Sequence, residues 1–261
     1  MTGMNDSPSD RPGLLVLLGG EGLRNEADSL WHLVENLSPG ALSNVACLSA
    51  ALANHKVETR DRQFRLISEH LASYGGSARL APISNHENDM SEDQNGLLED
   101  ASSYCFVGGE PMVLAGLMIG SPAWRTIRRR NAEGTPIIAS GAAAAAFGEF
   151  GIAPKRPFPA KLPDLTFESF PGLRLLPAAT VVLPYLSWLP DSLVGEMLGV
   201  CPADVHILGI DHPAALVWDG SAWQAEGLGS VTRLGANGTR QTVDAGQMIP
   251  ADWIPRHGKA A

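Results

Sequence analysis

The sequence predicts an α/β fold: a doubly wound, mostly parallel sheet with helices on both faces, extended by antiparallel strands in the C-terminal half. Two observations predict it. From residue 14 to residue 147, short apolar runs alternate with stretches of helical periodicity or strong helix formers, which is the pattern of parallel strands joined by crossover helices. After Glu149 the apolar runs lie near Asp-Gly and Asn-Gly pairs, which are typical of antiparallel hairpins.

The predicted strands of the first half are short apolar runs bounded by polar or glycine residues. They are residues 14–18, 44–51, 78–83, 103–107 and 136–139. The predicted helices are residues 26–37, 60–74, 112–119, a helix that begins at Pro122, and 142–147. Proline suits that first position because the N–H it lacks would have no partner within the helix. The polar stretch 84–94 is expected to be a surface loop.

The second half is richer in proline, glycine and short strands. Residues 153–163 are expected to form a proline-rich loop, and residues 166–170 and 173–176 flank a Pro-Gly pair that predicts a hairpin. A short helix is predicted over 192–198. The other predicted strands are residues 180–183, 206–211, 214–218 and 229–234. We expect these strands to extend the same sheet in antiparallel fashion.

The length of 261 residues suits one sizeable α/β domain. We expect that domain to cover residues 13–250, between a flexible tail (1–12) and a C-terminal tail (251–261). The N-terminal segment is polar and acidic, so it is not expected to be a signal peptide.

Charge and cysteine usage narrow the expected partners. The net charge of -9 argues against nucleic acid or an anionic membrane as a partner, and no apolar segment is long enough to span a bilayer. Cys47, Cys105 and Cys201 form no C-x-x-C pair, which argues against zinc and a disulfide framework and fits a cytoplasmic location. No metal or other cofactor is expected.

The stretch from Gly134 to Glu149 predicts a candidate active site. A buried strand is followed by the tiny residues Ser140 and Gly141 and then by an alanine-rich helix, which is the layout of a nucleophile elbow. In doubly wound sheets, function gathers at the carboxyl ends of the strands. Those ends carry Gly19-Gly20, Gly108-Gly109 and Ser140-Gly141.

Several stretches, in the right order and over nearly the whole chain, resemble one family. Phe106 to Gly109 matches the motif "F-x-G-G-x-Q", and Pro136 to Ala144 matches the strand that leads into "G-T-S-A-G-A". Gly209-Ile-Asp211 with Ala214 to Val217 matches "G-I-D-E-x-T-A-L-V". The other matching stretches are Gly19-Gly20-Glu21, Leu175 to Pro177 and Gly227 to Val231. The chain is similar to the cyanophycinase-like serine peptidases, which include the aspartyl dipeptidase peptidase E. The resemblance implies a class I glutamine amidotransferase-like fold and serine-type hydrolysis of aspartyl peptides.

The chain departs from the family at the residues that carry its chemistry. Registered on the following helix, the family's nucleophilic serine falls on Gly141 and the threonine before it falls on Ser140. The family's glutamine falls on Pro111, and the histidine of its "D-x-H-F" segment falls on Pro184. The arginines that usually follow that histidine are also missing. A serine needs a positioned base to act as a nucleophile, so these departures remove nucleophile and base together.

One hypothesis is therefore a non-catalytic relative that keeps the cleft as a binding or regulatory surface. The cleft and its oxyanion hole would be formed by Gly19, Gly20, Gly108, Gly109, Glu110, Gly141 and Ala142. We expect it to bind a small acidic peptide or another carboxylate. A homodimer, or association with an active paralogue, is the expected assembly.

The alternative hypothesis is an altered hydrolase, with Ser140 as a relocated nucleophile and His212 as its base. The simpler interpretations are that the Ser140 hydroxyl caps the next helix and that His212 is a turn residue. A glutaminase ranks last, because Cys105 lies in a strand and no cysteine lies at the elbow. The basic residues 125–130 either steer an acidic peptide or form a solvated helix face.

Overall fold

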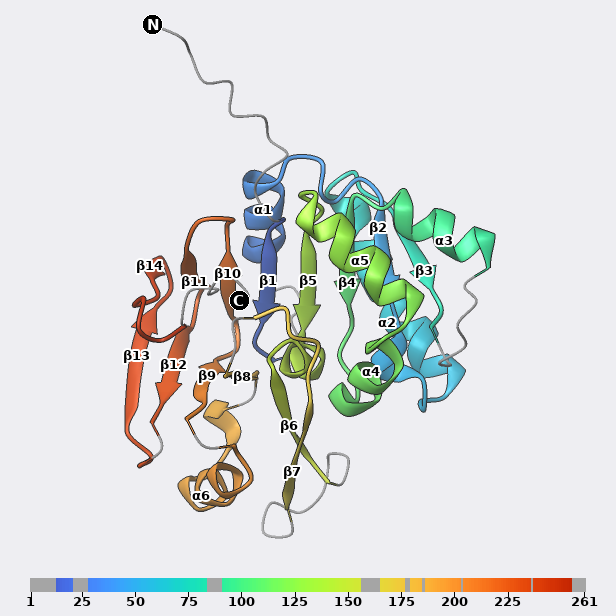
Figure 1. Cartoon of the computed structure of the whole chain (residues 1–261). Coiled ribbons are helices and arrows are strands. Elements are labelled where there is room, and N and C mark those ends of the chain that lie inside the picture. The colour runs from blue at the N-terminus through green and yellow to red at the C-terminus, as the bar shows by residue number, and fades with distance from the viewer. Residues whose placement is uncertain are drawn as a thin grey trace, which may run out of the picture.

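The central feature of the computed structural model is an eight-stranded sheet (Figure 1). The structure describes residues 13–20, 28–83, 91–155, 165–176, 179–184, 186–202, 204–235 and 237–254. The parallel strands are β1 (Leu15–Leu18), β2 (Val45–Leu48), β3 (Ala78–Ala81), β4 (Ser103–Phe106) and β5 (Ile137–Ser140). The antiparallel strands are β10 (Ala214–Trp218), β11 (Trp223–Gly227) and β14 (Gln247–Met248). The sheet order is β14-β11-β10-β1-β5-β4-β2-β3, and the predicted fold class is confirmed.

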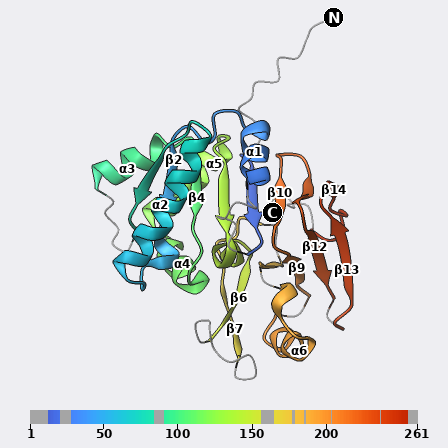
Figure 2. The ribbon, with the colours of Figure 1, turned by 180° about the vertical axis from the view of Figure 1, so that it is seen from behind.

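Helices cover both faces of this sheet. Successive residues of a strand point to opposite faces, and here the residues on both faces are apolar and need to be buried. Leu15 and Leu17 of β1 pack into one core and Val16 and Leu18 into the other. The helices on the first face are α3 (Glu92–Glu99), α4 (Pro111–Met118) and α5 (Pro122–Ala132). Those on the second face are α1 (Asp28–Leu37) and α2 (Val57–Ser73), seen in front in Figure 2.

The C-terminal half only partly extends the central sheet. Strand β10 extends it as predicted, together with β11 and β14, which were not predicted. The predicted strands 180–183, 206–211 and 229–234 lie instead in a second sheet with the order β13-β12-β9-β8. Its strands are β8 (Thr180–Leu183), β9 (His206–Ile210), β12 (Ser230–Leu234) and β13 (Arg240–Asp244), with β8 and β9 parallel. Helix α6 (Asp191–Gly199) packs on this sheet through Leu193, Val194 and Met197.

Two local predictions in this half were wrong. Strand β6 (Phe150–Pro154) reaches into the predicted loop, and it pairs with β7 (Phe167–Pro171). The predicted hairpin between residues 166–170 and 173–176 therefore does not form. The remainder of the predicted loop, residues 156–163, lies outside the described residues. The sequence indicated β7 by its apolar residues. Its partner strand, β6, lies on the other side of the loop, and no local pattern in the sequence identified that pairing.

The predicted surface loop at 84–94 was wrong at its C-terminal end. Residues 84–90 lie outside the described part, and α3 begins at Glu92. Ser91 and Gln94 form a capping box, in which Ser91 Oγ accepts from the Gln94 N–H at 3.2 Å and Gln94 Oε1 accepts from the Ser91 N–H at 3.2 Å. The Ser-x-x-Gln spacing was the available signal for this helix start.

Replacing Ser91 with alanine is expected to lower the free energy of unfolding by about 0.5–2 kcal/mol, because the cap satisfies an N–H that the helix leaves unpaired. Urea unfolding measures the change. Ser43, whose hydroxyl bonds only the Gly40 carbonyl in an exposed turn, offers a matched control whose alanine variant should change less. Equal losses in the two variants would contradict the capping role.

The packed part of the chain continues past residue 250. Trp253 and Ile254 are buried in the same core as α4 and α5. The predicted N-terminal tail, 1–12, lies outside the described residues. Among the helices that the structure describes, none has the length and apolar character needed to cross a membrane.

Candidate functional site at the carboxyl ends of the parallel strands

The predicted elbow follows β5, and its sharp turn is at Gly141. Ser140 ends the strand in an extended conformation, and Gly141 has a φ of +55°, a left-handed conformation that glycine adopts without steric cost. A 3-10 helix, η4 (Gly141–Ala146), follows directly. The sequence predicted a helix from Ala142, so the element exists but is tighter and starts earlier. The residue at the apex of the turn has no side chain.

Ser140 is buried within the strand rather than displayed by the turn. It is 2% exposed and lies in register with Leu18 of β1. Its hydroxyl makes no capping hydrogen bond to η4, so the helix-cap interpretation was wrong. Within the described part of the chain, no hydrogen bond joins Ser140 Oγ to an imidazole. The structure thus shows the Ser140 hydroxyl neither as a helix cap nor paired with a histidine.

The first glycine turn brings Pro184 and His212 to the end of β1. The Gly20 N–H donates to the Pro184 carbonyl at 2.9 Å, and the Gly19 N–H donates to the Ala214 carbonyl at 2.9 Å. His212 Nδ1 lies 3.3 Å from the Gly19 carbonyl oxygen. A Cβ added to Gly20 would lie 2.8 Å from the His212 ring. The glycines thus allow the turn between β9 and β10, which carries His212, to pass close to the end of β1.

The second glycine turn lies beside the elbow. A Cβ on Gly108 would be 3.6 Å from the Ser140 carbonyl oxygen and 4.0 Å from the Ala142 nitrogen. Gly109 has a φ of +124°. In the described chain the N–H groups of Gly108 and Gly109 donate to no acceptor. The Ala142 N–H lies in the first turn of η4, where N–H groups have no acceptor within the helix. Backbone N–H groups without an acceptor are the kind of donor that an oxyanion or carboxylate requires.

A histidine–glutamate pair borders this turn, and the sequence analysis did not identify its histidine. His55 Nε2 lies 3.5 Å from Glu110 Oε1, with side-chain exposures of 36% and 38%. His55 follows the 3-10 helix η3 (Ala50–Leu52) after β2, and Glu110 follows β4, the neighbour of β2 in the sheet. Helix α4 packs against both η3 and η4. These two side chains are neighbours because β2 and β4 are adjacent in the sheet, and this order cannot be read from the sequence.

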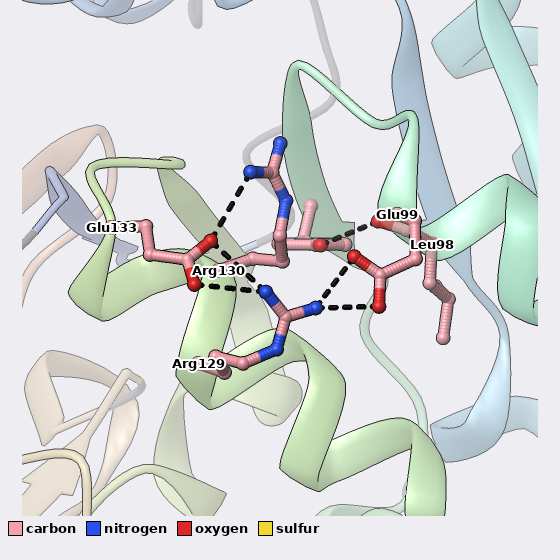
Figure 3. Close-up of polar contacts among 6 residues, drawn as sticks. Leu98, Glu99, Arg129, Arg130 and Glu133 are labelled. Carbon is pink, nitrogen blue, oxygen red and sulfur yellow. Dashed lines mark hydrogen bonds and ion pairs between the residues drawn. The ribbon is translucent and has the colours of Figure 1, made fainter.

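Two arginines of α5, Arg129 and Arg130, lie away from this site. Arg129 and Arg130 are in the last turn of α5, which leads into the amino end of β5, whereas the elbow follows its carboxyl end. Figure 3 shows Arg129 between Glu99 and Glu133, with Arg130 also contacting Glu133. These pairs join α5 to α3 and hold the pKa of Glu133 below its ordinary value. For Arg129 and Arg130 these contacts favour the second of the two interpretations, a surface face of the helix, over steering a peptide into the cleft.

The phenol of Tyr104 lies beneath this network. Its hydroxyl donates to the Leu98 carbonyl at 2.6 Å, and burial raises the pKa of Tyr104 to about 12. The side chain is fully buried between α3 and the sheet. The cluster therefore stabilises the packing of α3 on α5 and has no group directed to the carboxyl ends of the strands.

The cysteines do not contribute to the site. Cys47 and Cys105 are buried and lie in register on β2 and β4, so the prediction that Cys105 lies in a strand is confirmed. The neighbouring Cys105 thiol, together with burial, raises the pKa of Cys47. Within the described residues no group of three or more His, Cys, Asp or Glu side chains is arranged to hold a metal.

An open groove of about 670 Å³ lies elsewhere, between α6 and the turn that joins β12 to β13. The Arg240 guanidinium and the Asp191 carboxylate form an ion pair across it at 2.8 Å. Both side chains are on the surface, and the groove has none of the glycine turns. Because its walls are shallow and its charges are paired, we assign the chemistry to the strand ends instead.

Comparison with known proteins shows which fold this is. No family model matches the sequence, and no curated protein matches it. Among solved structures, a peptidase from an acI-B1 actinobacterium is similar, with a TM-score of 0.74 and 22% identity over 92% of this chain and 98% of that one. A candidate Peptidase E protein from Listeria monocytogenes EGD-e is also similar, with a TM-score of 0.58 and 15% identity over 83% of this chain and 99% of that one. The chain has the fold of these peptidases, which confirms the fold that the resemblance implied.

Proposed function

We propose that this chain is a non-catalytic relative of the cyanophycinase-like, peptidase E-type serine peptidases, and that its cleft binds a carboxylate. The observation that carries the proposal is the conformation of Gly141. A left-handed residue at the apex of the strand-to-helix turn is where an elbow displays its nucleophile, and here that residue is glycine. The likeness to a peptidase and to a candidate Peptidase E protein supports the family.

The base position supports the same conclusion. Pro184 has no titratable group, and its carbonyl accepts the Gly20 N–H. A general base must lie within hydrogen-bond reach of the nucleophile and titrate near the working pH. The alternative, a serine hydrolase with Ser140 as nucleophile and His212 as base, requires the buried Ser140 hydroxyl to reach the cleft. We therefore favour binding over hydrolysis.

The binding function rests on backbone groups, which the departures from the family leave in place. The unpaired N–H groups of Gly108 and Gly109 lie beside the elbow. N–H groups fixed by the fold bind negative oxygens without reorganising. A cleft that has these donors and no nucleophile binds the carboxylate of a ligand without hydrolysing the ligand. Association with an active paralogue, or with a second copy of the chain, is the regulatory part of this proposal.

The test combines hydrolysis with binding. Purified protein and a Ser140→Ala variant are incubated with cyanophycin and a panel of aspartyl dipeptides, and neither is expected to hydrolyse them. Hydrolysis that is lost in Ser140→Ala would establish the alternative and overturn the non-catalytic proposal. Hydrolysis that persists in the variant would overturn it as well, if the activity copurifies with the protein through successive columns.

A matched variant tests the cleft as the binding site. Gly108→Ala is expected to fold, because no atom lies closer than 3.6 Å to the added Cβ. The new methyl group occupies the space in front of the Ala142 nitrogen, so it should weaken carboxylate binding about tenfold or more. Gly116→Ala, on α4 with nothing within 4 Å, is the control and should bind like the parent protein. Isothermal titration calorimetry measures both.

A further inference from the structure

We infer that two copies of this chain pair through strand β13, antiparallel to each other and about a two-fold axis at Thr242. The inference rests on one part of the proposed function, association with a second copy, and is independent of what the cleft binds. Strand β13 is at one end of the second sheet, and both views show it at the margin of the molecule (Figure 1, Figure 2). An edge strand in this position can pair with another chain through its backbone.

The outward backbone groups of β13 belong to alternate residues. The Ala245 N–H donates to the Gly229 carbonyl at 3.1 Å, at the end of the β12–β13 ladder. Because hydrogen-bonded pairs alternate along an antiparallel ladder, Arg240, Thr242 and Asp244 direct their N–H and C=O groups away from β12. Within the described chain these groups have no hydrogen-bond partner. They are therefore available to a second strand.

A two-fold axis at Thr242 satisfies all of these groups together. In that register Thr242 lies opposite Thr242 of the second copy, and Arg240 lies opposite Asp244 of the second copy. Each outward residue then belongs to a hydrogen-bonded pair of the new ladder. A shift of one residue would place outward groups opposite inward ones, and a larger shift would leave an end of the strand without a partner.

Charge complementarity favours the same register. Arg240 begins β13 and Asp244 ends it, so two-fold pairing puts opposite charges directly across from each other, with about 4.5–5.5 Å between Cβ atoms. Among the described residues Asp244 has no ion-pair partner, and Arg240 pairs with Asp191 at 2.8 Å. The Asp191 side chain is 95% exposed, so this pair leaves the guanidinium accessible. In the dimer, Arg240 would lie between Asp191 and Asp244 of the second copy.

The other charges and strand edges of the described chain fit a second copy less well. Arg233 of β12 pairs with Asp252 at 2.9 Å, and it lies on the opposite face from Arg240 because it is in register with Gln241. Strand β3, at one end of the large sheet, carries Arg79 and no acidic residue, so its self-pairing would bring like charges together. Strand β14 has only 2 residues, and β8 is covered by β6 and η4.

Analytical ultracentrifugation of the ligand-free protein tests the pairing. The parent protein is expected to form a dimer with a dissociation constant on the order of 10 µM, since a single strand pair makes a small interface. Thr242→Pro should be monomeric, because proline removes the central outward N–H. A proline whose missing N–H would face solvent is tolerated on an edge strand, so the variant should fold, and urea unfolding verifies this.

Charge variants test the register even where the proline variant does not fold. Arg240→Glu and Asp244→Lys should each weaken self-association about tenfold or more, because like charges then oppose each other at both symmetric positions. An equimolar mixture of these two variants should form a heterodimer, since every opposed pair is again of opposite charge. Asp61→Lys makes the same charge change at an exposed position of α2, and this control should dimerise like the parent protein.

Three results would each overturn the inference: a monomeric parent protein, a dimer that these β13 variants leave unchanged, or a mixture that stays monomeric. Assemblies larger than a dimer would also overturn it, because a two-fold contact closes on itself. The cleft is judged separately by calorimetry. Carboxylate binding by a monomeric protein leaves the proposed binding function standing, whereas a dimer that binds no carboxylate leaves the β13 contact standing.

Discussion

Replacing Phe147 with alanine is expected to lower the free energy of unfolding by about 3–5 kcal/mol, the usual cost of truncating a fully buried phenylalanine. Phe147 follows η4 and is completely buried. Its ring packs edge-on against Phe106 at 5.2 Å and Trp124 at 6.1 Å between ring centroids. The cavity left by the variant would lie directly beneath the elbow. Urea unfolding monitored by circular dichroism measures the loss.

The control for this variant is Phe64→Ala. Phe64 lies on α2 and is only half-buried, so its truncation removes less apolar surface and should cost clearly less. Because the Phe147 ring packs against Phe106 and Trp124 directly after η4, its loss should let η4 move and so weaken carboxylate binding. A loss below about 1 kcal/mol for Phe147→Ala would mean that the aromatic cluster does not hold the elbow.

The parallel part of the fold was predictable because its signals are local. Strands buried on both faces appear as continuous apolar runs, as in β1 and β4, and helices such as α2 show one apolar face. The glycine turns that end these strands were visible for the same reason. Sheet membership was less predictable, because β8, β9 and β12 have the same local pattern as β10. Their partners, which lie far along the chain, decide which sheet each strand joins.

The glycine turns of the site could be predicted, because turn conformation depends on local sequence. The side chains that meet at the site could not, because their proximity depends on the order of the strands in the sheet. Gly141 and the glycine pair at Gly108 could be identified from the turn residues alone. His55 could not, because its proximity to Glu110 follows from the adjacency of β2 and β4. The two interpretations of the α5 arginines stayed open for the same reason, since a sequence does not state which end of the sheet a helix end approaches.

Replacing Gly109 with alanine is expected to destabilise the protein by about 2–6 kcal/mol, because two costs of about 1–3 kcal/mol each apply together. The first is conformational: a φ of +124° is outside the regions that residues with a Cβ adopt. The second is steric, since the added Cβ would lie 2.4 Å from the Ala51 carbonyl oxygen. Relief requires the turn to move away from η3, and Glu110 moves with it.

Alanine variants at two other glycines distinguish the conformational cost from the steric cost. Gly120 has a φ of +77° with nothing within 4 Å of its Cβ position, so Gly120→Ala should show the conformational cost alone, about 1–2 kcal/mol. Gly108 has neither feature, and Gly108→Ala should be close to neutral in urea unfolding while it blocks the cleft. If Gly109→Ala costs no more than Gly120→Ala, the close approach of the turn to Ala51 is not present in solution. The position assigned to Glu110 would then need revision, because that approach is what fixes its backbone beside the unpaired N–H groups.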